Sequence, residues 1–302
     1  MPVNALQDRN IRQSAEKNGP LFAENFIQSA YYDICCPLFV TDSEMIGIFD
    51  SGVGGMTVAH AVEQLLPDHS LIYYGDIART PYGPKSPKTI IEYSIRNTEF
   101  LLDRGAELII IACNSASSVA TTSLRERFKV PIIEVVSPAA HRAAATSSNG
   151  RVGIIGTRAT VKSGIYQKTI LAKRPECKVS QQACPLLVPL VEEDWLNKRE
   201  TKMILRRYLH PFKEKQIDTL VLGCTHYPLL KELIQPRIGK RVKLIDSSVE
   251  TAHYVKEFLT RNPEIVSREE CVSHSYYVSD STETARKVAE RIFSRPMELI
   301  LA

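Results

Sequence analysis

Two short apolar runs, each followed by a cysteine, constrain the fold of this 302-residue chain more than any other feature. The first run extends from Leu108 to Ala112 and leads into Cys113, and the second extends from Leu220 to Gly223 and leads into Cys224. Short apolar runs rich in Ile and Val and bounded by turn residues are typical of buried parallel strands. Because ligands of open α/β sheets bind beyond the carboxyl ends of such strands, both thiols are predicted to lie where small-molecule chemistry occurs.

Strand and helix signals alternate along the body of the chain. Strands are predicted at residues 45–49, 71–74, 108–112 and 132–136, and helices between them at about 57–66, 87–103 and 114–128. This order predicts an α/β fold with a mostly parallel, doubly wound sheet. Near Pro138 the pattern starts again, since residues 151–157 resemble residues 45–51 and a later strand again precedes a cysteine. We therefore predict two such domains, related by duplication, whose cysteine loops face each other across one cleft.

The chain is too long for a typical single core, so the repetition also sets the predicted domain boundaries. We predict an N-terminal extension of residues 1–44, a first α/β domain of residues 45–136 plus 247–302, and a second of residues 137–246. Residues 21–40 of the extension carry aromatic and aliphatic side chains, partly at helical spacing. That spacing predicts a helix packed on the body rather than a fully disordered tail.

Composition narrows the class of protein. The chain has no apolar run long enough to span a membrane, and its first residues lack the pattern of a secretory signal. Seven scattered cysteines without a CxxC pair indicate reduced thiols in a cytoplasmic protein. The CxH spacing of Cys224 and His226 lacks the second pair that a zinc site needs. A net charge of +4 gives no footprint of nucleic-acid binding.

A cysteine at a strand end is most often a small buried apolar residue, but two in matching contexts favour chemistry. A working thiol must ionise, and a neighbouring imidazole, helix N-terminus or backbone amides promote this; His226 lies two residues beyond Cys224. Asp50 follows a predicted strand and precedes a glycine-rich turn. It either caps the next helix or orients and deprotonates a thiol. The turn matches neither a dinucleotide-binding nor a P-loop pattern, so a nucleotide site is weakly supported.

Two further segments have ordinary interpretations beside functional ones. Pro81, Tyr82 and Gly83 form a turn by default, although a phenol and a bare amide there could hold a carboxylate. Glu192 is a surface acid on composition alone. His226 by itself would more often be a polar or capping group, and only its proximity to Cys224 makes a catalytic role equally plausible.

Six motifs together resemble those of a known family. They occur in the family's order and cover the chain from about Met45 to the C-terminus, and they read IGIFDSGVGGMTV, YYGDIARTPYG, IACNSAS, PLLVPLVEED, VLGCTHYPLL and IDSSVETA. The set is similar to the cofactor-independent amino-acid racemases, and to the glutamate racemases among them. The resemblance implies two flavodoxin-like domains in pseudo-twofold relation with the active site between them. It also implies an isomerase that interconverts L- and D-glutamate for peptidoglycan and cell-wall synthesis, without PLP, metal or nucleotide cofactor, acting as a homodimer.

The resemblance also assigns roles to individual residues. Cys113 matches the thiol that takes the α-proton from D-glutamate, and Cys224 the thiol that takes it from L-glutamate. Asp50 and His226 match the groups that assist these two thiols, and Glu192 matches a further acid near the second. The substrate-binding positions comprise these two cysteines, Asp50 and His226, together with Ser51, Pro81, Tyr82, Gly83, Asn114, Ser115 and Thr225.

The sequence differs from the family pattern in two respects, and it leaves two alternative functions open. Ser115 replaces the usual threonine, which keeps the hydroxyl group but changes the packing, and residues 1–44 have no counterpart in the shortest members. Some members with N-terminal extensions are activated by a peptidoglycan precursor, and this extension could serve such an activator. One rival is an aspartate or hydantoin racemase. The other is a non-catalytic amino-acid sensor, in which Asn114 and Thr225 bind the ligand and the cysteines only pack.

Overall fold

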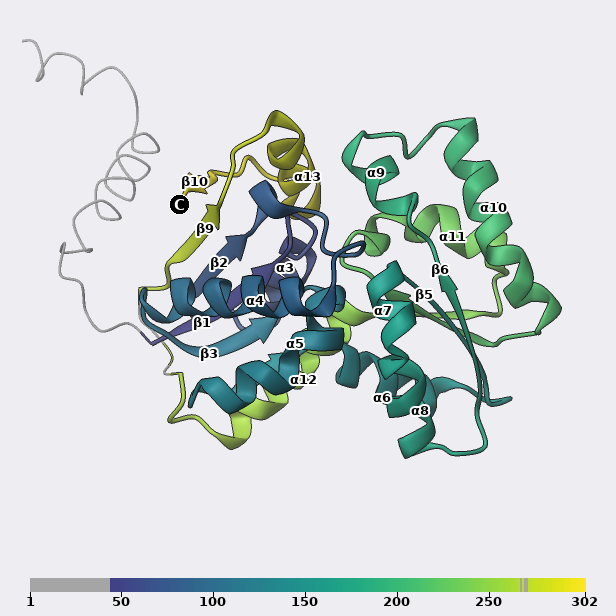
Figure 1. Cartoon of the computed structure of the whole chain (residues 1–302), viewed down its shortest axis with the longest axis horizontal. Coiled ribbons are helices and arrows are strands. Elements are labelled where there is room, and N and C mark those ends of the chain that lie inside the picture. The colour runs from purple at the N-terminus through teal and green to yellow at the C-terminus, as the bar shows by residue number, and fades with distance from the viewer. Residues whose placement is uncertain (1–43, 267, 269–270) are drawn as a thin grey trace, which may run out of the picture. The chain divides into compact units, whose positions relative to one another are not determined.

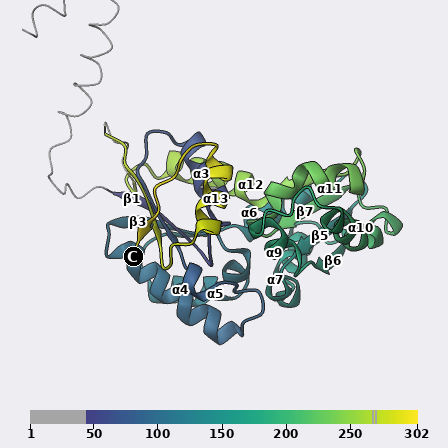
Figure 2. The same cartoon turned by 90° about the horizontal axis from the view of Figure 1, so that it is seen from above.

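The computed structural model describes residues 44–266, 268 and 271–302, and all structural statements below concern these residues. The predicted N-terminal extension lies outside them except for Glu44, as does the helix predicted within residues 21–40. The described part contains two sheets in which every strand pair is parallel (Figures 1 and 2). The predicted α/β class with two parallel sheets is therefore confirmed.

The first sheet has the strand order β10-β9-β2-β1-β3-β4. Its strands are β1 (Met45–Asp50), β2 (Leu71–Gly75), β3 (Ala106–Ile111), β4 (Ile132–Glu134), β9 (His274–Val278) and β10 (Ile300–Leu301). The second sheet has the order β6-β5-β7-β8 and consists of β5 (Arg151–Gly156), β6 (Lys178–Ala183), β7 (Thr219–Gly223) and β8 (Lys243–Asp246). The order β2-β1-β3-β4 repeats as β6-β5-β7-β8, so the cysteine-bearing strands β3 and β7 hold corresponding places.

Helices cover both faces of the first sheet. They are α3 (Met56–Leu65), α4 (Pro87–Leu102), α5 (Asn114–Arg127), α12 (Ser247–Arg261) and α13 (Glu283–Phe293), with the short 3₁₀ helix η1 (Ile77–Arg79). Side chains of β3 alternate between two cores: Leu108 and Ile110 pack toward α3 and α12, whereas Ile109 and Ile111 pack toward α4 and α5. Because both faces are buried, the strand reads as an unbroken apolar run.

The second sheet is covered in the same manner. Its helices are α6 (Val136–Thr146), α7 (Arg158–Ser163), α8 (Ile165–Lys173), α9 (Leu187–Glu192), α10 (Arg199–Glu214) and α11 (Lys231–Ile238), with η2 (Tyr227–Leu230). Helix α12 contacts α3 beside the first sheet and α6 beside the second, and Figure 2 shows α12 and α6 between the two sheets. The packing of α12 against α3 and α6 thus connects the sheet that contains β3 with the sheet that contains β7. The predicted domain boundaries at 136–137 and 246–247 stay a prediction.

Strand β4 differs from the sequence-based expectation. The strand predicted at 132–136 ends at Glu134, because the Glu134 carboxylate accepts the backbone N–H groups of Val136 (2.6 Å) and Ser137 (2.9 Å) and starts α6 there. The segment after Cys224 differs from the segment after Cys113, since the short η2 comes before α11 begins at Lys231. Cys113 directly precedes α5, at whose N-cap position it lies, whereas Cys224 does not adjoin a long helix.

Candidate active site

The first predicted thiol lies in a buried cluster at the ends of β1 and β3. Cys113 is 4% exposed, and its Sγ donates to the hydroxyl oxygen of Ser51 over 3.4 Å. Burial raises the pKa of Cys113 to about 12, and the negative charge of Asp50 adds to the rise while the hydrogen bond with Ser51 opposes it. Cys113 is therefore a protonated thiol at neutral pH in the absence of substrate, which differs from the expectation of an easily ionised thiol.

Asp50 is the charged group beside this thiol. Its Oδ2 accepts the backbone N–H groups of Gly52 (3.1 Å) and Gly55 (3.0 Å), whereas its buried Oδ1 has no hydrogen-bond partner among the described residues. Burial raises the pKa of Asp50, against the opposing charge of His226 and the backbone hydrogen bonds. A buried carboxylate with a raised pKa and an unused oxygen is suited to accept a proton from a neighbouring thiol.

The second predicted thiol has a different set of partners. Cys224 is 5% exposed and interacts with the side chain of His226, whose Nε2 lies 3.1 Å from Oε1 of Glu192. Burial alone would lower the pKa of His226, but the interactions with Cys224 and Glu192 outweigh it and raise this pKa to about 10. The imidazole is therefore cationic at neutral pH and lies between a thiol and a carboxylate.

The two clusters approach each other at Gly54. A Cβ atom on Gly54 would lie 2.3 Å from Nδ1 of His226 and 2.6 Å from Oγ1 of Thr225, so only glycine fits there. Three residues after Gly54, Oγ1 of Thr57 donates to the carbonyl oxygen of Thr225 (3.1 Å). The glycine-rich turn after β1 therefore serves close packing against the His226 loop, which agrees with its lack of a nucleotide-binding pattern.

The remaining predicted substrate-binding residues lie in the loops next to these clusters. The hydroxyl groups of Ser115 and Thr157 are 2.9 Å apart, and Oδ1 of Asn114 accepts the phenol proton of Tyr166 (2.7 Å). Both hydrogen bonds join the α5 terminus to elements of the second sheet. The hydrogen bond from Tyr166 fixes the orientation of the Asn114 amide, whose NH₂ group donates to Oγ of Ser247 (3.5 Å).

The phenol of Tyr82 is not free to bind a ligand. Its hydroxyl donates to Oδ2 of the fully buried Asp76 (2.6 Å) and accepts from the amide of Asn97 (3.1 Å). Burial, followed by the charge of Asp76, raises the pKa of Tyr82. The carbonyl of Gly83 accepts the N–H of Ala159 (3.1 Å). The loop that carries the exposed Pro81 is therefore anchored through Tyr82 and Gly83, and any substrate contact of Tyr82 involves its backbone rather than its phenol.

Several residues of this region escaped the sequence analysis. Thr157 follows β5 as Ser51 follows β1, and this correspondence between the two halves could have identified Thr157 as a site residue. Ser247 and Ser248 follow β8, and the Oγ of Ser248 lies 2.8 Å from Oγ1 of Thr57. Tyr166 carried no signal, because nothing in its local sequence distinguishes it from an ordinary buried tyrosine.

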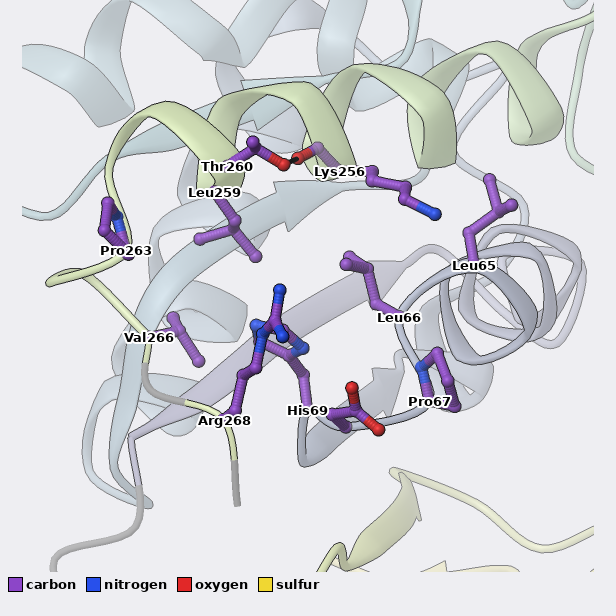
Figure 3. Close-up of a pocket in the computed structure, with 11 residues that line it drawn as sticks. Leu65, Leu66, Pro67, His69, Lys256, Leu259, Thr260, Pro263, Val266 and Arg268 are labelled. Atoms are coloured by element: carbon purple, nitrogen blue, oxygen red, sulfur yellow. Dashed lines mark hydrogen bonds between the residues drawn. The ribbon is translucent and has the colours of Figure 1, made fainter. Parts of the chain in front are cut away.

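A separate cavity of about 560 Å³ lies at the other edge of the first sheet (Figure 3). It is lined by the C-terminal ends of α3 and α12 and by the segment 66–69 that leads into β2, and Lys256 and Arg268 are among its lining residues. Since Leu71 starts β2, this cavity lies at the amino end of the strand, opposite the edge that carries the cysteines. It contains none of the predicted site residues.

Within residues 44–266, 268 and 271–302, no helix is long and apolar enough to cross a membrane. In the same ranges, no group of three or more His, Cys, Asp and Glu side chains is arranged to hold a metal ion.

Comparison with known proteins places this geometry in context. The family model described as Asp/Glu/Hydantoin racemase matches residues 56–255. A glutamate racemase from Geobacter metallireducens is 47% identical over 78% of this chain and 87% of its own length. The crystal structure of Francisella tularensis glutamate racemase in complex with D-glutamate has a TM-score of 0.80 at 34% identity, covering 87% of this chain and 98% of that one. The Escherichia coli glutamate racemase, solved with L-glutamate and the activator UDP-MurNAc-Ala, has a TM-score of 0.72 at 30% identity, covering 86% and 97%.

Proposed function

Because this chain belongs to the Asp/Glu/Hydantoin racemase family, we propose that it interconverts L- and D-glutamate by a two-thiol mechanism and supplies D-glutamate for peptidoglycan synthesis. The observation that carries the mechanism is that each predicted thiol has its own buried acid–base partner. Cys113 lies in the electrostatic field of Asp50, and Cys224 interacts with His226, which contacts Glu192. Racemisation needs one group on each face of the α-carbon, because a single base cannot easily reach both.

Each turnover transfers one proton away and one proton back. With L-glutamate, Cys224 as thiolate takes the α-proton while protonated Cys113 delivers its proton to the opposite face, which forms D-glutamate. With D-glutamate the roles reverse, and Cys113 must first lose its proton. The unpartnered Oδ1 of Asp50, a carboxyl group with a raised pKa, is suited to receive it. On the other side, cationic His226 is suited to exchange a proton with Cys224.

The carbanion-like transition state needs stabilisation of charge on the α-carboxylate. Hydroxyl and amide groups of Ser51, Asn114, Ser115 and Thr225 are proposed to supply hydrogen bonds to the substrate. All but Ser51 are almost fully buried, and hydrogen bonds are worth more in a water-poor site than in water. Their orientation is fixed in advance by neighbours such as Tyr166 and Thr157, so little reorganisation accompanies the reaction.

The first test measures racemisation in single alanine variants. Cys113→Ala and Cys224→Ala should each lower kcat by at least about 10²–10⁴-fold, the range expected for loss of one proton-transfer partner. Cys177→Ala, at a buried cysteine before β6, is the matched control and should retain full activity. Separate incubations with L-glutamate and L-aspartate, followed by measurement of the D-enantiomer, decide between the two substrates. A full-rate Cys113 or Cys224 variant would refute the two-thiol assignment.

The second test separates the two thiols. In Cys113→Ser and Cys224→Ser, elimination of HX from a β-substituted glutamate requires only removal of the α-proton by the remaining thiol. Each variant should therefore eliminate from one enantiomer only, Cys113→Ser from the L form and Cys224→Ser from the D form. If both variants acted on both enantiomers, or neither acted on any, the division of labour would be wrong.

A further inference from the structure

A groove of about 590 Å³ lies next to the Gly83 loop but outside the clusters around the two thiols. Its walls come from residues 83–87, from the first turn of α4, from α5 and from α7, and we call it the α4–α7 groove. Figure 1 shows α7 beside the ends of α4 and α5. A volume of this size is typical of sites for small organic ligands.

The charge of the α4–α7 groove has one sign. Three cationic side chains line it, Lys85, Arg158 and Lys162, and no carboxylate does. None of the three forms an ion pair with another residue of the described ranges, whereas Arg79 pairs with Asp76 and, elsewhere in the structure, Lys231 pairs with Asp246. Arg158 and Lys162 are four residues apart on α7, so they project from the same side of the helix. Uncompensated charges around a concave surface focus the field and attract anions.

The groove also offers an apolar surface. Pro84, Pro87, Ile90 and Val119 line it between the cations. The N-terminus of the 16-residue helix α4, where Ser86 accepts the N–H of Thr89, faces the same space and adds partial positive charge. A matching ligand therefore combines an apolar body with a group that carries close to two negative charges. A phosphate monoester has this charge at neutral pH, and arginine binds phosphate oxygens bidentately.

We propose that the α4–α7 groove is a binding site for an organic phosphate, separate from the catalytic thiols. The phosphate lies between Lys85 and the Arg158–Lys162 pair, and the apolar body lies on Ile90 and Val119. Lys85 belongs to the Gly83 loop and the other two cations to α7, which are already joined by the hydrogen bond from Ala159 to Gly83 (3.1 Å). A phosphate that contacts both sides would strengthen this junction at the margin of the catalytic region.

The test is a direct binding measurement on the full-length chain, so its outcome does not depend on the racemase assignment. The probe is 1-naphthyl phosphate, titrated by calorimetry at low ionic strength, with inorganic phosphate and 1-naphthol as the two halves of the ligand. The variant Arg158→Gln/Lys162→Gln should bind the probe at least about tenfold more weakly, the loss expected for one charge-assisted hydrogen bond. The control Arg206→Gln/Arg207→Gln removes the same charge from the exposed face of α10 and should bind as the unmodified chain does.

The expected pattern is a naphthyl phosphate affinity that exceeds that of either half ligand and persists in saturating glutamate. Equal affinity of the probe for the groove variant and the unmodified chain would overturn the proposal. Equal losses in both double variants would show only a general effect of net charge and would also overturn it. Complete displacement by glutamate would place the probe at the catalytic thiols, and inorganic phosphate binding as tightly as the probe would exclude an organic ligand.

Discussion

At the scale of residues, the two thiols differ in the charge of the group beside them. Asp50 places a negative charge near Cys113 and contributes to raising the pKa of that thiol to about 12. Cys224 instead has His226, whose own pKa is raised to about 10. The two thiols therefore have opposite electrostatic environments: Cys113 is a proton donor beside a carboxylate, and Cys224 lies next to a cation.

We expect Asp50→Asn to speed the alkylation of Cys113. The amide keeps an oxygen for the N–H groups of Gly52 and Gly55 but removes the charge that disfavours the thiolate. A fall of one pKa unit corresponds to about a tenfold increase in the thiolate fraction, and hence in the rate with iodoacetamide near neutral pH. Mass spectrometry of the Cys113 peptide gives the rate. Glu99→Gln, which removes an exposed carboxylate that pairs with Arg127, serves as the control. An unchanged rate in Asp50→Asn would contradict the electrostatic argument.

Glu192→Gln should lower the pKa of His226 from about 10 toward its ordinary value of 6.5. The raised pKa means that folding favours the imidazolium, so its stabilising contribution is complete below pH 6.5 and lost as pH rises through about 10. The stability deficit of the variant should therefore be larger at pH 7 than at pH 10. Urea unfolding at the two pH values and NMR titration of the imidazole measure these effects. A deficit that grows with pH would have the wrong sign.

At the scale of elements, helix termini connect the site to the fold. Thr157 caps α7 by accepting the N–H of Thr160 (3.2 Å), and the same hydroxyl lies 2.9 Å from Ser115. A residue that caps a helix and also contacts a predicted substrate-binding side chain should affect both stability and substrate binding when it is replaced.

Thr157→Ala should lower the free energy of unfolding by about 1 kcal/mol, the usual effect of losing an N-cap, and should also raise KM for the substrate. Thr282→Ala removes the corresponding cap of α13, where Thr282 accepts the N–H of Ala285 (3.1 Å). This control should lose similar stability and keep its KM. Thr157→Ser, which retains the hydroxyl, should restore KM. If both alanine variants changed KM equally, the contact with Ser115 would have no functional part.

The sequence predicted those elements whose local pattern matches their environment. Strand β3 was recognisable because both of its faces are buried, and the positions of Cys113 and Cys224 after corresponding strands followed from the repeat. Edge strand β6 was not identified, because Ser180, Gln181 and Gln182 are only partly buried and give no apolar run. Strand β4 is shorter than predicted because the Glu134 carboxylate accepts a backbone N–H group of the next helix. Strand propensity contains no information on such a hydrogen bond.

The contacts within the site could not be predicted from spacing. Glu192 and His226 are 34 positions apart and meet only because α9 and the loop after β7 pack together. The hydrogen bond between Tyr166 and Asn114 spans 52 positions and joins elements of both sheets. Such contacts arise from tertiary packing, whereas residue type and motif order identified the residues that take part.

At the scale of the whole molecule, the two sheets are held together at the glycine-rich turn after β1. Gly54 approaches His226 so closely that a methyl group cannot be added without displacing the imidazole or the turn. Hydrogen bonds of Thr57 with Thr225 and Ser248 lie next to this point. The close approach of Gly54 to the His226 side chain is therefore one of the contacts on which the geometry of both thiol clusters depends.

Gly54→Ala should lower kcat/KM by about 10²-fold, because a displacement of the order of 1 Å disturbs both clusters at once. Gly164→Ala is the control: its positive φ of 67° makes alanine mildly strained, but nothing lies within 4 Å of the added methyl group. The control should lose about 1 kcal/mol of stability at unchanged kcat/KM. Circular dichroism should show that both variants are folded. Full activity of Gly54→Ala would show that the contact is not needed.

The unequal surroundings of Cys113 and Cys224 also bear on how a racemase of this kind can be tuned. Mirror-image substrates have the same free energy in water, so the equilibrium constant is one and kcat/KM must be identical for the two directions. Asp50 on one side and the His226–Glu192 pair on the other can therefore alter kcat and KM only in compensating proportion. Evolution can use that asymmetry to set the concentration at which each enantiomer saturates the enzyme. The direction of net flux is then determined by the reaction that consumes one of the enantiomers.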